Sequence, residues 1–156
     1  MPSGAHPFEV PRRRLFGSPY VLPRSVAAAL EQLFEEPVDG VIVIEHSRYA
    51  KLHRGISATT RPNRIFLAMS GAEFAASPEL LLHEYYHVLC QWRTGYLTRW
   101  RYVMESVRRG SRRNRYEEEA REFAAAAVEQ YCRLLFPQRE DRVDGLCYTP
   151  EYSRKE

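Results

Sequence analysis

Cysteine is scarce in this sequence, and its spacing argues against two common kinds of small stabilised domain. The chain of 156 residues has three cysteines, Cys90, Cys132 and Cys147, which lie far apart and show no paired C-x-x-C spacing. An odd and dispersed set of this kind is not typical of a disulfide framework or of a cysteine-ligated zinc module. We therefore expect free thiols and a reducing compartment.

Long apolar runs are also missing. No stretch approaches the roughly 18–20 consecutive apolar residues that a membrane-spanning helix requires. The segment from Met1 to Arg24 is rich in proline and arginine and lacks the apolar core of a secretory signal peptide. We expect a cytoplasmic protein with no membrane partner, and a non-classical export route stays open because it needs no such signal.

Lysine is almost absent, since the basic side chains are 21 Arg and 2 Lys, and the formal net charge is +3. Several of the arginines form a local basic patch, which consists of Arg108, Arg109, Arg112, Arg113 and Arg115. The patch is either the solvated surface of a loop between helices or a rim that attracts an acidic peptide or nucleic acid. No nucleic-acid-binding motif accompanies it, so we do not expect a nucleic-acid partner.

The composition, 44% hydrophobic and 12% aromatic residues, is that of one globular domain. We place this domain at residues 25–138, between a Pro/Arg-rich extension at 1–24 and a polar tail at 139–156. The tail contains enough apolar and ligand-capable groups, between Leu146 and Tyr152, to lie over a cleft.

The hydrophobic pattern predicts an α+β fold with a small β-sheet. We expect strands at 41–45, 55–60 and 63–68. We expect helices at 25–36, 77–94, 97–109 and from Tyr116 to Phe136, the last of which ends at Pro137. The helix at 77–94 has Ser77 as its N-cap, Pro78 at its first position and Thr94-Gly95 as its stop.

The chemistry of the chain centres on His83-Glu84-Tyr85-Tyr86-His87, which is an H-E-x-x-H motif inside an apolar stretch of helical length. Four residues apart on a helix, His83 and His87 point the same way and can bind one Zn²⁺. Glu84 follows the first histidine directly, where its carboxylate can take a proton from a metal-activated water. Two histidines and a glutamate in a buried helix need partners, and core histidines paired with backbone carbonyls would not explain the spacing.

A catalytic zinc site needs a third protein ligand. The best candidate is Glu117, because it lies one turn before Ala120 on the apolar face of the following helix. Glu118 lies on another side and is expected to be solvated. Glu119 is the main rival of Glu117 as a ligand.

The combination of HExxH with E-x-x-A-x-x-F-A on a second helix, here Glu117, Ala120, Phe123 and Ala124, resembles the gluzincin metallopeptidases. The wider stretch at 37–136 looks like small bacterial HExxH domains of unknown function, some of which are cargo of extracellular contractile injection systems. The resemblance implies a minimal zincin-like domain, with a small sheet packed on the HExxH helix and a second helix that carries the Glu ligand. Many gluzincins have an Asp four residues after the ligand Glu, but this position is Arg121, so another acceptor must orient a ligand histidine.

We therefore predict a zinc-dependent metallopeptidase whose metal ligands are His83, His87 and Glu117 and whose general base is Glu84. Its substrate would be a peptide or protein, and the strand from Ile65 to Ala68 would pair with it along its edge. Tyr102, Tyr116 and Arg113 are candidate donors to the oxyanion. The alternatives are a weakly active or inactive metal-binding module with a regulatory or interaction role, and a toxin-like effector. The sequence leaves the oligomeric state open.

Overall fold

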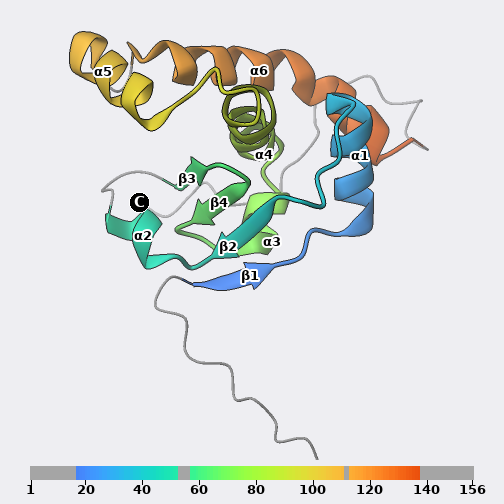
Figure 1. Cartoon of the computed structure of the whole chain (residues 1–156). Coiled ribbons are helices and arrows are strands. Elements are labelled where there is room, and N and C mark those ends of the chain that lie inside the picture. Colours follow the sequence, from blue (N-terminus) through green and yellow to red (C-terminus); the bar gives the residue numbers. More distant parts are fainter. Residues whose placement is uncertain (1–16, 53–56, 111–112, 138–156) are drawn as a thin grey trace, which may run out of the picture.

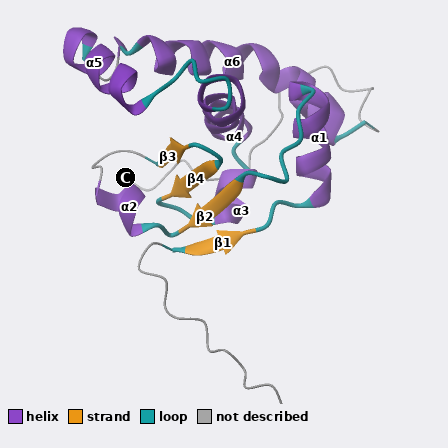
Figure 2. Cartoon of the chain, in the orientation of Figure 1, coloured by secondary structure: helices purple, strands orange, loops and turns teal. Residues whose placement is uncertain are grey.

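A computed structural model describes residues 17–52, 57–110 and 113–137 of the chain. The described residues form an α+β fold with a four-stranded mixed sheet and six α-helices (Figures 1 and 2). The expected α+β class is confirmed at this level. The elements are β1 (Ser18–Tyr20), α1 (Arg24–Phe34), β2 (Ile42–Glu45), α2 (Arg48–Leu52), β3 (Ala58–Arg61), β4 (Arg64–Leu67), α3 (Gly71–Ala75), α4 (Pro78–Tyr86), the π-helical segment η1 (His87–Trp92), α5 (Arg99–Arg109) and α6 (Arg115–Leu135).

The strand order is β1-β2-β4-β3, with β2 and β4 parallel and the two outer pairings antiparallel. Strands β3 and β4 form a hairpin whose turn contains Asn63 at a φ of 55°, a conformation that asparagine tolerates better than most residues. Strand β4 is therefore an interior strand with partners on both sides. The prediction that 65–68 offers a free edge to a peptide is wrong, because β3 is the outer strand on this side of the sheet among the described residues.

Three short elements were not predicted, namely β1, α2 and α3. Strand β1 lies within the segment assigned to the N-terminal extension, yet it pairs with β2. The side chain of Tyr20, the last residue of β1, lies against Gly71. A Cβ added at Gly71 would come within 2.0 Å of an atom of the Tyr20 ring. Helix α3 begins with a capping box, in which the Ser70 side chain accepts from the Glu73 backbone N–H and Glu73 accepts from Ser70 N–H.

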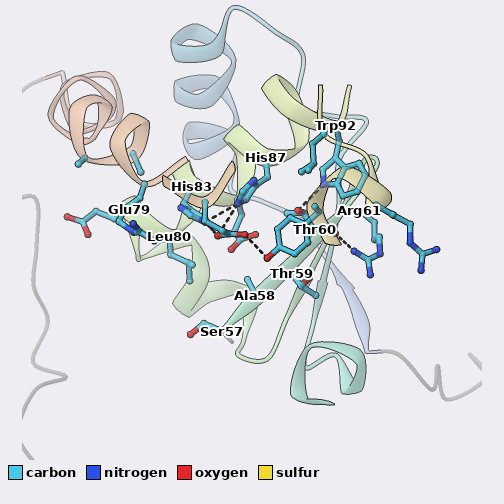
Figure 3. Close-up of a pocket in the computed structure, with 18 of the residues that line it drawn as sticks. Ser57, Ala58, Thr59, Thr60, Arg61, Glu79, Leu80, His83, His87 and Trp92 are labelled. Carbon is cyan, nitrogen blue, oxygen red and sulfur yellow. Dashed lines mark hydrogen bonds and ion pairs between the residues drawn. The ribbon is translucent and has the colours of Figure 1, made fainter. Parts of the chain in front are cut away.

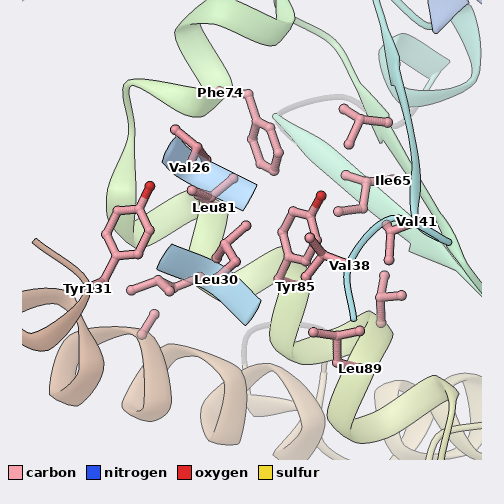
Figure 4. Packing of buried hydrophobic residues seen from close by; sticks show 14 of the residues in the cluster. Val26, Leu30, Val38, Val41, Ile65, Phe74, Leu81, Tyr85, Leu89 and Tyr131 are labelled. Atoms are coloured by element: carbon pink, nitrogen blue, oxygen red, sulfur yellow. The ribbon is translucent and has the colours of Figure 1, made fainter. Parts of the chain in front are cut away.

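Helix α4 lies between the sheet and α6 (Figure 1). Its Leu81 and Tyr85 are fully buried and pack with residues of α1 and the sheet, such as Leu30 and Ile65 (Figure 4). On the opposite side α6 presents small buried residues toward the core, which are Ala120, Ala124 and Ala127. Because apolar side chains pack against α4 from the sheet side and from α6, a polar group that is buried on it is costly unless it has a specific partner.

The cysteines differ from the expectation. Cys90 is a free thiol, whereas Cys132 is disulfide-bonded. The prediction of free thiols is therefore wrong for Cys132, and the cysteines no longer support the expectation of a reducing compartment. Within the described ranges, no helix combines the length and apolar character needed to cross a membrane. Cys147, most of the N-terminal extension and the tail expected to lie over a cleft fall outside the described residues.

Candidate metal centre

Three side chains, one each from α4, η1 and α6, converge at the HExxH motif. His83 lies in the last turn of α4, His87 begins η1, and Glu117 lies in the first turn of α6. Their ligand atoms all lie within 4.8 Å of one another. Glu117 Oε2 is 3.2 Å from His83 Nε2 and 3.5 Å from His87 Nε2, and the two Nε2 atoms are 3.0 Å apart (Figure 3).

The packing of α6 on α4 explains why Glu117 is the residue of α6 that lies next to the two histidines. Buried Ala120 and Ala124 bring the two helices together, and Glu117 continues the same face one turn earlier. The Tyr102 hydroxyl of α5 donates to Glu117 Oε1 at 3.0 Å, which leaves Oε2 directed at the histidines. Burial would raise the pKa of Glu117, but the hydrogen bonds and charges of His83 and His87 lower it, so the carboxylate stays ionised.

The cluster attracts positive charge. Burial alone would lower the pKa of His87, but the hydrogen bond to Glu117 and the charge of Glu84 raise it. Two imidazole nitrogens and one carboxylate oxygen, drawn together around one point, are a donor set that suits Zn²⁺. The residues present therefore fit the metal that the sequence predicts.

Gln91 fixes which nitrogen of His87 faces the cluster. The Gln91 side-chain amide donates to the Tyr116 carbonyl at 3.1 Å and to Glu119 Oε2 at 3.2 Å. Both partners only accept, so the amide oxygen must point the other way, where it lies 2.7 Å from His87 Nδ1. The network thus assigns the imidazole proton to Nδ1 and leaves the Nε2 lone pair for the cluster.

Gln91 lies four residues after His87, about one helical turn further along and on the same side, within the π-helical segment η1. Arg93 N–H donates to the Val88 carbonyl five residues earlier, as this geometry requires. The sequence predicted one continuous helix here and therefore missed both the segment and the role of Gln91. The sequence signal that could have identified this role was Gln91 itself, a polar residue in an apolar stretch four positions after His87.

The network also separates the two glutamates that competed for the ligand role. Glu119 accepts from Gln91 through Oε2 and from the Tyr96 hydroxyl through Oε1 at 2.9 Å. It is absent from the converging cluster, which contains Glu117. Glu119 therefore supports Gln91, and through Gln91 it supports His87.

We predict that Gln91→Leu weakens zinc binding by about 10–100-fold, because His87 loses the partner that holds its tautomer and orientation. The measurement is the zinc dissociation constant by competition with a chelator, with circular dichroism to establish that the variant is folded. Gln130→Leu, an exposed change on α6, is the matched control. A folded Gln91→Leu variant with unchanged zinc affinity would contradict the role given to Gln91.

Glu84 lies beside the cluster and not within it. Its residue is only 5% exposed, and burial raises the pKa of its carboxyl against the lowering effect of the two histidines. No described side chain donates a hydrogen bond to it, so its oxygens are available to another molecule. A buried, weakly acidic carboxyl next to a metal-ligand cluster has the character of a proton acceptor.

The cluster lies in a cleft of about 780 Å³. Residues of β3 form one wall, and Figure 3 shows Ala58 and Thr60 of this strand near the two histidines. Helices α5 and α6 contribute the other side, including Tyr102, Arg99 and Arg121. Of the candidate oxyanion donors, only Tyr102 lines the cleft, because Tyr116 is buried elsewhere and Arg113 lies outside the lining.

Comparison of the chain with protein-family models, with curated proteins and with solved structures gives no significant match, so its function has to be inferred from the site itself.

Proposed function

We propose that this protein is a zinc-dependent peptidase with a minimal zincin-like fold. The observation that carries the proposal is the convergence of His83, His87 and Glu117 within 4.8 Å beside buried Glu84 and an open cleft. Three protein ligands of this kind leave a fourth position for water or substrate, which is typical of catalytic zinc sites. The resemblance of the HExxH and E-x-x-A-x-x-F-A motifs to gluzincins supports the same assignment.

Bound Zn²⁺ would supply Lewis acidity, lowering the pKa of water and polarising a carbonyl. The chain's own groups divide the remaining work. Glu84 accepts the proton of the attacking water and delivers it to the leaving amine, for which its raised pKa suits it. Gln91 holds the His87 ring, and Tyr102 holds Glu117 through Oε1. Tyr102 also lines the cleft, but its one hydroxyl proton is donated to Glu117, so it could donate to a developing oxyanion only after leaving Glu117.

The outer edge of β3, which borders the cleft, is the place where an extended peptide would bind by adding a strand to the sheet. The Ser57 carbonyl accepts from Ala68 N–H, so Ser57 and Ala68 are a hydrogen-bonded pair of the β3–β4 ladder. In an antiparallel ladder, hydrogen-bonded pairs alternate with pairs whose backbone groups point outward. Thr59 and Arg61 therefore bond to β4, while the backbone groups of Ala58 and Thr60 point away from it. Arg61 Nη1 reaches the Thr60 carbonyl at 3.1 Å from that outer side. Ala58 and Thr60 line the cleft.

A peptide hydroxamate, which combines a zinc-binding group with an extended backbone, tests the proposal in one experiment. We expect the zinc-loaded protein to cleave an unfolded protein such as casein, and the hydroxamate to inhibit cleavage. Hydrogen exchange should show added protection of the Ala58 and Thr60 amides. Absence of bound zinc after mild purification, together with no cleavage, would overturn the proposed function. Inhibition without protection in 57–61 would overturn only the binding edge.

A further inference from the structure

Helix α5 carries an exposed apolar stripe, formed by Trp100, Val103, Met104 and Val107. The spacing i, i+3, i+4, i+7 places all four on one face of the helix. They are 72%, 48%, 42% and 76% exposed, respectively, and no residue of α5 is buried. A helix face of this kind normally packs against a core, so its exposure indicates a binding surface. We refer to these four residues as the α5 stripe.

The α5 stripe is not the side by which α5 is attached to the domain. The attachment uses the opposite face, where the Asn114 side chain donates to the Tyr102 carbonyl at 3.3 Å and to Ser106 Oγ at 2.8 Å. Tyr102 adds its hydrogen bond to Glu117. Helix α5 lies at one end of the molecule, beside the start of α6 (Figure 1). The stripe therefore faces outward while the helix itself is held in place.

The stripe is continuous with the cleft. Arg99, Tyr102 and Val103 all line the cleft, and Val103 also belongs to the stripe. A chain that leaves the cleft on the α5 side would therefore pass directly onto Trp100, Met104 and Val107. This continuity connects an exposed apolar surface to the place where the proposed chemistry occurs.

The borders of the stripe are basic. At 100° per residue, Arg99 lies on one side of it and Arg108 and Arg101 lie on the other. Helix α5 has four arginines and one glutamate, and that glutamate, Glu105, is paired with Arg109. Among the described residues, no carboxylate forms an ion pair with Arg99 or Arg108. The surface thus matches a partner that combines apolar and acidic side chains.

We infer that the α5 stripe is an exosite for protein substrates, which binds an acidic segment with apolar side chains just outside the cleft. This inference rests on the proposed peptidase function and names a substrate class for it. A second copy of this chain is a poor occupant, because pairing two α5 helices would bring like charges together. An anionic membrane would also match apolar and basic groups, but continuity with the cleft favours the substrate.

The test uses Glu84→Gln protein, so that a bound peptide is not cleaved, and two labelled peptides. Both have the same leucine and phenylalanine positions, and they carry either glutamate or lysine between them. By fluorescence anisotropy we expect the glutamate peptide to bind at least about tenfold more tightly. Adding Trp100→Ser with Val107→Ser should weaken it by about tenfold or more, and Arg108→Glu should remove most of the discrimination. Matched controls at exposed sites near α1, Val21→Ser and Arg24→Glu, should leave binding unchanged.

Equal binding of the two peptides, or no loss in the Trp100→Ser/Val107→Ser protein, would overturn the exosite. So would stripe-dependent binding to anionic lipid vesicles without peptide discrimination, because the surface would then be a membrane contact. Zinc content and cleavage of a short peptide are measured separately in protein with intact Glu84. A protein that cleaves short peptides but binds both long peptides equally contradicts only the exosite. A protein that binds the glutamate peptide through the α5 stripe but holds no zinc and cleaves no peptide contradicts the proposed function.

Discussion

Replacing Glu84 by glutamine should lower peptide cleavage by about 10²–10⁴-fold, the range expected for loss of a general base. The amide has nearly the same shape but cannot accept the proton of water. Zinc content should stay at the level of the unchanged protein, because Glu84 is not part of the converging ligand atoms. The fold should also persist, since burial already disfavours the charged form of Glu84, and a neutral side chain there is no harder to bury.

The measurements are the rate of cleavage, zinc by atomic emission and the thermal unfolding midpoint. Glu79→Gln is the matched control, because Glu79 lines the same cleft but is exposed and outside the cluster. Loss of zinc together with activity in Glu84→Gln would show that Glu84 is a ligand or supports one. Retained zinc with no cleavage by the unchanged protein would favour the alternative of a metal-binding module without peptidase activity.

Replacing Glu117 by glutamine should weaken zinc binding more than the roughly 10–100-fold that loss of a supporting partner costs. The change removes the only anionic group in the three-residue cluster. It also leaves two neutral imidazoles, which hold a zinc ion weakly without a third ligand. Zinc affinity, measured by competition with a chelator at constant pH, reports this loss without any assay of activity.

Two further glutamates of α6 provide the comparison. Glu119→Gln should have a smaller effect than Glu117→Gln, because Glu119 acts only through Gln91. Glu122→Gln, at an exposed position, should have none. If Glu119→Gln releases more zinc than Glu117→Gln, the two roles assigned from the structure are reversed.

The part of the site that depends on local spacing could be predicted from the sequence. Helical geometry alone brings His83 and His87 to one side, and the small residues Ala120 and Ala124 indicated which face of α6 meets α4. The choice between Glu117 and Glu119 depends on a rotation of about 200° around that helix. The pattern favoured Glu117, and the structure brings Glu117 into the cluster.

The features that were missed depend on information that is not local. Strand β4 was expected to offer a free edge, but the parallel pairing of β2 with β4 makes it interior, and no short-range pattern shows strand order. Helix α5 was predicted, but not that the side carrying Trp100 would stay exposed, because the same amphipathic pattern also describes a helix packed on a core. The π-helical segment was missed because its residues also suit a regular helix.

The pairing of β1 with β2 has a practical consequence for the choice of protein fragments. The composition suggests cutting at residue 24, yet such a cut would remove Ser18–Tyr20 and turn β2 into a bare edge strand. Bare edges of this kind associate with one another and lead to aggregation. The cut would also remove the Tyr20 ring from its place against Gly71. A soluble, monodisperse preparation therefore calls for a fragment that retains residues 17–24, and poor behaviour of a shorter one would reflect the exposed sheet edge and not a defect of the metal centre.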